Sequence, residues 1–150
     1  MSFPKISDSM RLERLQPPTG VVNVVIDTDT YNEIDDQFAV VHALLSPEKL
    51  AVEALYATPF FNHRSTSPGA GMEMSYDEIV RLLDRLNLSA DHLAFRGSNG
   101  FLTDYEHPYT SPAVDDLIER AMGTDDPLYV IAIGALTNIA SAILIEPRII

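Results

Sequence analysis

Short apolar runs alternate with helix-like patterns from residue 21 to the end of the chain. Four runs are rich in β-branched and other apolar residues and have the length of strands buried in a parallel sheet. These expected strands cover residues 21–26, 50–58, 92–95 and 128–133. Helical patterns occupy the intervening and following segments, at residues 34–45, 76–88, 111–122 and 137–145. This alternation predicts an α/β fold with an open, mostly parallel sheet and helical crossovers.

Three segments fall outside this alternation. Residues 1–20 are polar and end in the breaker PPTG, so we expect an N-terminal extension before a domain that covers residues 21–150. Residues 59–75 are rich in Pro, Gly, Ser and Asn, which predicts a long loop. Residues 149–150 resemble the start of another strand, so we expect the sheet to be incomplete in this chain.

Composition restricts the function classes. The formal net charge is −12, from 22 acidic and 10 basic residues, which disfavours nucleic acid and anionic membranes as partners. The chain contains no cysteine, which excludes thiolate metal sites and cysteine nucleophiles. It has no run of apolar residues long enough for a transmembrane helix and no signal-peptide pattern at its start. We therefore expect a cytoplasmic protein.

Four aspartates follow the first expected strand within ten residues: Asp27, Asp29, Asp35 and Asp36. Ligands of open parallel sheets bind beyond the carboxyl ends of the strands, where these carboxylates are expected. Carboxylates crowded together repel each other unless protons or a cation neutralise them. Oxygen ligands favour a hard ion, Ca²⁺ or Mg²⁺. The alternative for Asp35 and Asp36 is that they cap the next helix and complement its dipole.

Further candidates lie after other strands. Asn62 is expected beside the end of the first strand, where its amide would either recognise a hydroxyl group or serve as a turn residue. Thr137 and Asn138 follow the fourth expected strand, and they either cap the next helix or turn a backbone carbonyl towards a metal. The pattern favours structural roles for His42, in a helix, and His63, in a loop.

Two segments carry a family resemblance. Residues 25–29 (VIDTD) with 35–39 (DDQFA), and residues 132–140 (AIGALTNIA), resemble two recurring motifs of the inosine–uridine preferring nucleoside hydrolases. The resemblance spans roughly residues 21–148. Chains of that family are about twice as long, so we expect this chain to correspond to its N-terminal half. The resemblance implies Ca²⁺-dependent hydrolysis of the N-glycosidic bond of a ribonucleoside, which gives free base and ribose.

The resemblance also implies roles for the metal-facing residues. Asp29 matches the metal-bound aspartate that takes a proton from the attacking water, and Asp36 matches an aspartate that chelates calcium. Thr137 matches the residue that supplies a backbone carbonyl to the metal. These roles agree with the ability of a bound divalent ion to lower the pKa of its water.

The remaining roles concern the sugar and the support of the site. Asp35 matches a residue that contacts the metal region and the ribose hydroxyls, and Asn62 matches an asparagine that holds a ribose hydroxyl. Asp27 matches the first aspartate of the motif, which supports the metal ligands from behind. The expected partners are a small-molecule nucleoside and further copies of the same chain.

The sequence departs from the family pattern in two ways. Residues 30–34 (TYNEI) replace a short Pro-Gly type link, and Tyr31, Asn32 and Glu33 are thereby candidates for the ribose or base pocket. The later metal-binding aspartate, the ribose-binding Asn/Glu cluster and the leaving-group histidine of the family have no counterpart. We therefore expect this chain alone to bind metal weakly and to catalyse poorly. The base preference is left open.

Two other classes fit part of the pattern. A Mg²⁺-dependent phosphatase of the haloacid-dehalogenase type also places Asp-x-Asp after a buried strand. That pattern requires Thr or Val two residues after the second Asp, where this chain has Tyr31, and a later Lys and acidic pair that we cannot place. The other class is a non-catalytic relative that binds a nucleoside. The altered residues 30–34 favour this alternative.

Overall fold

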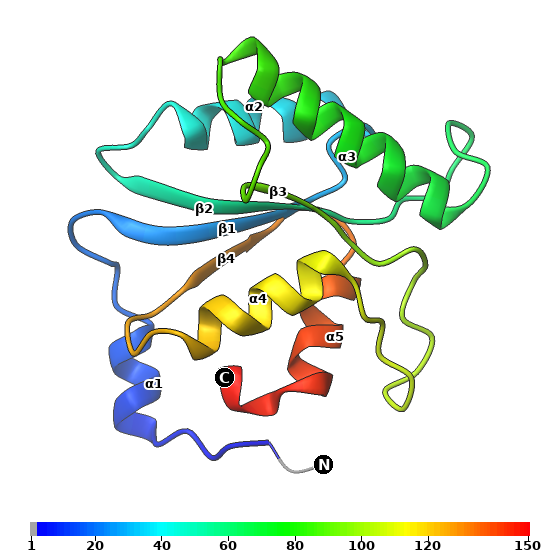
Figure 1. Cartoon of the computed structure of the whole chain (residues 1–150). Coiled ribbons are helices and arrows are strands. Elements are labelled where there is room, and N and C mark those ends of the chain that lie inside the picture. Colours follow the sequence, from blue (N-terminus) through cyan, green and yellow to red (C-terminus); the bar gives the residue numbers. More distant parts are fainter. Residues whose placement is uncertain (1–2) are drawn as a thin grey trace.

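The computed structural model describes residues 3–150 and contains one four-stranded sheet (Figure 1). The strands are β1 (Val22–Thr28), β2 (Leu50–Ala57), β3 (Ala94–Arg96) and β4 (Tyr129–Ala132). They lie in the order β3-β2-β1-β4, and every neighbouring pair is parallel. The α/β fold with a parallel sheet is thereby confirmed.

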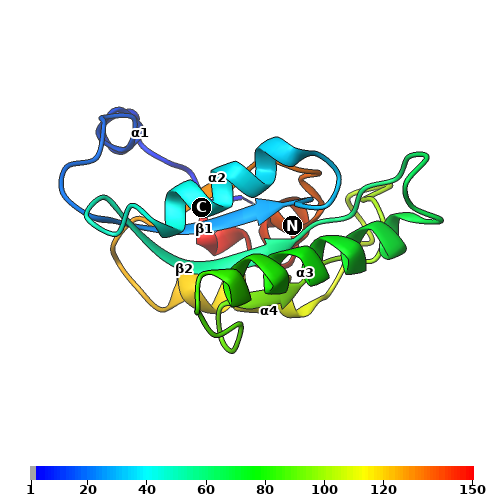
Figure 2. The ribbon, with the colours of Figure 1, turned by 90° about the horizontal axis from the view of Figure 1, so that it is seen from above.

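Helices cover both faces of the sheet. They are α1 (Asp8–Arg14), α2 (Ile34–Leu44), α3 (Pro68–Arg85), α4 (Pro112–Met122), α5 (Thr137–Ile145) and a 3₁₀ turn, η1 (Pro147–Ile149). Helices α2 and α3 lie on one face, and α4 and α5 lie on the other (Figures 1 and 2). No helix within residues 3–150 is long and apolar enough to cross a bilayer.

The alternation of side chains along β1 and β2 creates two hydrophobic cores. Ile26 and Leu55 point into the core beneath α2 and α3. Val25 and Tyr56 point into the core beneath α4 and α5. Because successive side chains of a strand face opposite sides, a central strand with helices on both faces must be apolar at nearly every position. This requirement explains the continuous apolar run that marked β1 in the sequence.

The long loop expected at residues 59–75 is partly wrong, because α3 begins at Pro68. Ser67 caps this helix by accepting a hydrogen bond from the backbone N–H of Ala70 at 3.1 Å. Gly71 is required in the first turns, because a Cβ there would lie 2.0 Å from the carbonyl oxygen of Phe60. The glycines needed for this close approach gave the segment the composition of a loop. The helix also ends at Arg85, before the expected residue 88.

Both ends of the chain also differ from expectation. The polar segment 1–20 contains the exposed helix α1, which Ser7 caps. Residues 147–149 form η1 and do not start a strand. Pro147 is the first residue of this turn, and the carboxylate of Glu146 accepts a hydrogen bond from the N–H of Arg148 at 3.1 Å. Both features stabilise a turn in place of a strand. The division of the chain at residue 20 stays a prediction.

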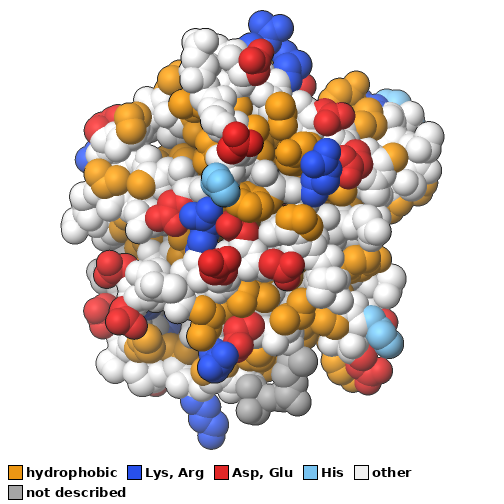
Figure 3. Space-filling view, in the orientation of Figure 1, with side chains coloured by type: hydrophobic (Ala, Val, Ile, Leu, Met, Phe, Trp, Pro, Cys, Tyr) orange, Lys and Arg blue, Asp and Glu red, His pale blue; other side chains and the backbone are white. Residues whose placement is uncertain are grey.

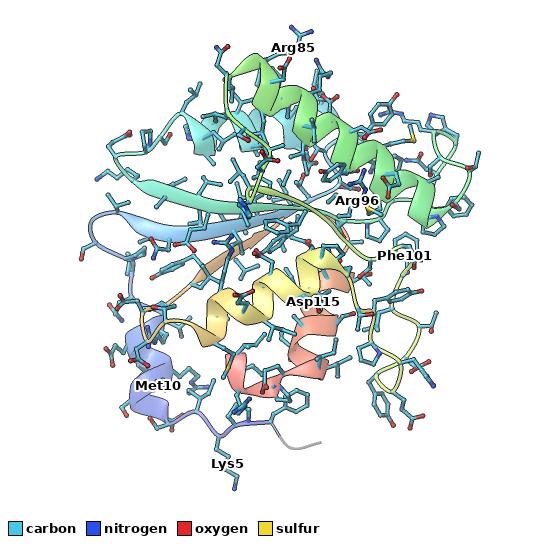
Figure 4. All side chains as sticks on the ribbon, in the orientation of Figure 1. Lys5, Met10, Arg85, Arg96, Phe101 and Asp115 are labelled. Carbon is cyan, nitrogen blue, oxygen red and sulfur yellow. The ribbon has the colours of Figure 1, made fainter. Side chains whose placement is uncertain are left out.

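Charged side chains hold the rim of the fold together. Arg96, at the end of β3, lies beneath α3 (Figure 4), where its guanidinium pairs with Glu73 at 2.9 Å and stacks 3.8 Å from the centre of the Tyr76 ring. Acidic side chains are spread among apolar ones on the face shown in Figure 3, and no broad basic patch gathers there within the described part of the chain. The absence of nucleic acid as a partner stays a prediction.

Candidate functional site

The candidate site lies at the carboxyl end of β1, the position where open parallel sheets bind ligands. Strand β1 continues to Thr28, two residues further than the sequence indicated, because Asp27 pairs in register with Tyr56 of β2 and Ala132 of β4. Asp27 and Thr28 are therefore part of the strand, and Asp29 is the first residue after it. Successive positions alternate, so Asp27 faces α5 and Thr28 faces α2.

On the α5 side, one amide connects the ends of all four strands. The Nδ2 atom of Asn138 donates to Oδ1 of Asp27 in β1 at 2.7 Å and to the carbonyl oxygen of Ala57 in β2 at 3.2 Å. Its Oδ1 accepts from the backbone N–H and the hydroxyl of Ser98, after β3, at 2.7 and 2.8 Å. Asn138 itself follows β4. All of these atoms are buried, and the network thus fixes the edge of the sheet that carries the candidate site.

Asp27 is buried without a charged partner. Burial raises the pKa of Asp27 to about 7, the hydrogen bond from Asn138 opposes this increase, and the charge of Asp29 adds to it. Its second oxygen, Oδ2, accepts no hydrogen bond from residues 3–150. A carboxylate in this environment is costly to ionise, because it is buried and no basic side chain of the described residues pairs with it.

On the α2 side, the hydroxyl of Thr28 donates to Oδ1 of Asp36 at 2.6 Å, in the first turn of α2. Asp36 is almost fully buried. Burial raises the pKa of Asp36 to about 6, although the bond from Thr28 lowers it, and the charges of Asp29, Asp35 and Glu33 raise it further.

Asp29 is held between two loops. Burial raises its pKa, the side-chain hydrogen bond from Asn32 lowers it, and the charges of Glu33 and Asp35 raise it. The amide of Asn32 donates to Oδ2 of Asp29 at 3.0 Å. Gly134 closes the opposite side: a Cβ there would lie 2.9 Å from both Oδ1 and the backbone nitrogen of Asp29. A side chain at position 134 would therefore displace this carboxylate.

The other predicted residues are placed less uniformly. Asp35 is exposed on the first turn of α2. Asn62 is also exposed, and its amide donates to Oδ1 of Asn32 at 2.6 Å. Thr137 is buried at the start of α5, where its hydroxyl accepts a bond from the N–H of Leu102 at 3.4 Å. The roles of these residues towards metal and sugar stay predictions.

The acidic residues meet part of the requirements of a calcium site. No group of three or more His, Asp or Glu side chains within residues 3–150 is placed to hold a metal ion. Calcium takes about six to eight oxygen ligands. The Asp29 and Asp36 carboxylates are the right donors for a hard cation, but they need further oxygens from backbone carbonyls, water or a ligand.

The structure also reveals side-chain contacts in the site that the sequence did not predict. Asn138 was a candidate for helix capping or for a backbone carbonyl turned towards a metal, but its side chain is bound to Asp27, which lies 111 positions earlier in the chain. Thr28 lies between two singled-out aspartates, yet its bond to Asp36 depends on how α2 returns to the strand. The strand–Asp–Thr–Asp pattern marked the location of both contacts, but no local signal identified the partners.

Comparisons with known proteins agree with this architecture. A family model described as "Cellulose-binding Sde182, nucleoside hydrolase-like domain" matches residues 23–146, which include both segments that carry the resemblance. No curated protein matches the chain. The match supports a nucleoside hydrolase-like relationship, favours it over the phosphatase alternative, and does not extend to the inosine–uridine preferring family specifically. The chain belongs to the family of cellulose-binding Sde182, nucleoside hydrolase-like domains.

Proposed function

We propose that this chain provides the Asp29 and Asp36 part of a Ca²⁺-dependent site that hydrolyses the N-glycosidic bond of a ribonucleoside. One observation carries the proposal: buried carboxylates gather at the carboxyl end of the central strand without a basic partner. No Lys, Arg or His side chain within residues 3–150 forms an ion pair with Asp27, Asp29 or Asp36. Burying an ionised acid without a counter-charge lowers the stability of the folded state. Such acids therefore mark sites where a ligand supplies the missing charge.

The chemistry follows from the environment of each acid. When bound, calcium lowers the pKa of a coordinated water molecule. In the proposed site, Asp29 and Asp36 would hold the cation, and Asp29 would be the acceptor for a proton of the attacking water. A cation beside Asp29 also offsets the burial that raises its pKa, and so keeps it ionised and basic at neutral pH. Asp27 and the Asn138 amide keep the strand end in place behind them.

The sugar-facing part of the proposal rests on Asp35 and Asn62. Asp35 is exposed in the first turn of α2 and can accept hydrogen bonds from hydroxyl groups. Asn62 is exposed on the loop after β2. The proposed metal-facing role of the Thr137 carbonyl, at the start of α5, rests on the resemblance alone. Hydroxyl contacts that strengthen as the sugar becomes oxocarbenium-like would stabilise the transition state.

The test is nucleoside hydrolysis by the full-length protein. We expect release of free ribose from a panel of purine and pyrimidine nucleosides in the presence of Ca²⁺, and loss of this release in EDTA. Asp29→Asn should reduce kcat by at least about 100-fold, because it removes the proton acceptor. Asp116→Asn, in an acidic group away from the site, is the matched control. Unchanged turnover by the Asp29→Asn variant would contradict the proposal.

A second candidate function is binding of a glycan without hydrolysis, and the aromatic rim of the site favours it. Tyr31 is 43% exposed and stacks on Phe60, with ring centres 6.4 Å apart and planes 13° from parallel. The neighbouring Phe61 is 59% exposed. Aromatic rings offer flat apolar surfaces to sugar rings, and the description of the family includes cellulose binding.

Binding to insoluble cellulose separates the two functions. Retention of the full-length protein on cellulose, lost in Tyr31→Ala and Phe61→Ala and unaffected by EDTA, would support the second candidate. Tyr105→Ala, in another exposed loop, is the matched control. Ribose release together with no retention on cellulose would exclude the second candidate and support the first.

A further inference from the structure

We propose that Asn32 is a positioning residue, which orients Asp29 and couples the loop after β1 to the loop after β2. The coupling is a property of this chain alone. Its consequence for cation binding rests on the proposed function. Asn32 belongs to residues 30–34, the segment that departs from the motif of the inosine–uridine preferring nucleoside hydrolases.

The inner contacts of Asn32 act on Asp29. Its side-chain Nδ2 donates to Oδ2 of Asp29 at 3.0 Å, and its backbone N–H donates to the carbonyl oxygen of Asp29 at 2.6 Å. One residue thus restrains both the carboxylate and the backbone of Asp29. A charge-assisted hydrogen bond of this kind is stronger than one between neutral groups, so it selects one orientation of the carboxylate.

The outer contacts of Asn32 connect it to the loop after β2. Its Oδ1 accepts a hydrogen bond from Nδ2 of Asn62 at 2.6 Å, and its backbone carbonyl accepts one from the guanidinium of Arg64. The Oδ1 atom of Asn62 in turn accepts the backbone N–H of Arg64 at 2.9 Å. The two loops therefore form one hydrogen-bonded unit, and its inner end is the carboxylate of Asp29.

The two carboxylate oxygens of Asp29 differ in their hydrogen bonding. Oδ2 is engaged by Asn32, while Oδ1 lies beside Gly134 and receives no side-chain hydrogen bond from residues 3–150. Oδ1 is thus the oxygen available to a cation or a water molecule. It follows that Asn62, which the resemblance assigns to the sugar, affects Asp29 through Asn32.

The prediction is a hierarchy among three variants of the full-length protein: Asn32→Ala, Asn62→Ala and the double variant. Isothermal titration with Ca²⁺ should show about 10-fold weaker binding for Asn32→Ala, as expected for loss of a hydrogen bond to a charged group. Asn62→Ala should weaken binding by about 3-fold, because it loosens Asn32 without removing the bond to Asp29. The double variant should match Asn32→Ala, because Asn62 acts through Asn32.

Hydrogen exchange provides a readout that does not depend on a metal. In EDTA, the amides of residues 60–66 should exchange faster in both single variants than in the wild type. Asn23→Ala, at the opposite end of β1, is the matched control and should change neither measurement. Circular dichroism should confirm that all variants are folded.

Four outcomes would decide between these possibilities. Wild-type Ca²⁺ affinity in Asn32→Ala, or additive effects in the double variant, would overturn the positioning role. Unchanged exchange in residues 60–66 of Asn32→Ala would overturn the coupling of the loops. No Ca²⁺ binding by the wild type would instead remove the proposed function, and the exchange measurement would still support or overturn the coupling.

Discussion

Two polar clusters of this fold use carboxylates in opposite ways. In the cluster between β2 and α4, Asp116 accepts hydrogen bonds from the hydroxyl of Tyr56 and from Nε of Arg120, both at 2.7 Å. Arg120 also pairs with Glu53 at 3.4 Å. In the cluster at the carboxyl end of β1, formed by Asp27, Asp29 and Asp36, the bonds come only from neutral amides and hydroxyls.

The difference separates a structural cluster from a candidate binding site. Arg120 supplies a positive charge within the chain, so the first cluster needs nothing further. The second has no such charge, and burial raises the pKa of all three of its acids. A buried acid without a counter-charge does not stabilise the folded state. Such an acid therefore indicates a place where a ligand supplies the positive charge. The following predictions test that contrast.

The largest effect is expected from Asn138→Ala. The substitution removes the donor to Asp27 and the acceptor for Ser98, and so leaves several buried polar groups unsatisfied. We expect the free energy of unfolding to fall by about 4 kcal/mol, with 1–3 kcal/mol for each unsatisfied group. Urea unfolding measures the change, and exposed Asn23→Ala is the control. A loss no larger than that of the control would show that the network does not hold the strand ends.

The next effect is a pH dependence of stability in the metal-free protein. The pKa of Asp27 is about 7 in the fold against 3.8 for an unperturbed carboxyl, so between these values the folded state binds more protons than the unfolded state. The free energy of unfolding must therefore fall as pH rises. We expect Asp27 alone to contribute a loss on the order of 3 kcal/mol from pH 5 to pH 8.

Urea unfolding in EDTA across this pH range measures the loss. Asp27→Asn should remove the Asp27 part of the slope, because an amide does not titrate, and leave the smaller part, at lower pH, that Asp36 and Asp29 contribute. Asp116→Asn should leave the slope in place, because its acid belongs to the cluster that Arg120 compensates. A wild-type free energy of unfolding that does not change with pH would contradict the conclusion that Asp27 in β1 lacks a counter-charge.

A smaller effect is expected in the compensated cluster. Arg120→Ala removes the partner of Asp116 and Glu53, whose side chains are 15% and 31% exposed. Because water reaches these acids, we expect a loss of only about 1–2 kcal/mol in the free energy of unfolding. Ca²⁺ affinity should not change. A loss of Ca²⁺ binding in Arg120→Ala would show that the two clusters are not independent.

Much of the architecture could be predicted from local patterns. The apolar run before Asp27 identified the central strand, because the side chains on both faces of a covered strand are buried and must be apolar. The start of α3 at Pro68 was missed, although Ser67 and Pro68 form the same cap-and-proline signal as Ser111 and Pro112. The glycines that follow Pro68 concealed the helix, and their reason is a contact with Phe60 that only the folded chain shows.

The candidate site could be located but not assembled from the sequence. The positions of Asp29 and Asp36 after a buried strand indicated where charge would gather. The partners that fix these acids are neutral side chains distant in sequence: Asn138 is 111 positions from Asp27, and Asn62 is 30 positions from Asn32. Neutral amides occur throughout loops, so their spacing carries no signal until the fold brings them together.

The central claim is that the carboxyl end of β1 lacks a positive charge that a divalent cation supplies. Isothermal titration of the full-length protein with Ca²⁺ tests it most directly, with Asp36→Asn and Asp116→Asn as the compared variants. We predict saturable Ca²⁺ binding that is at least about 10-fold weaker in Asp36→Asn, since a charged ligand is lost, and unchanged in Asp116→Asn. Equal binding by the wild type and Asp36→Asn, or no binding by the wild type, would contradict the account.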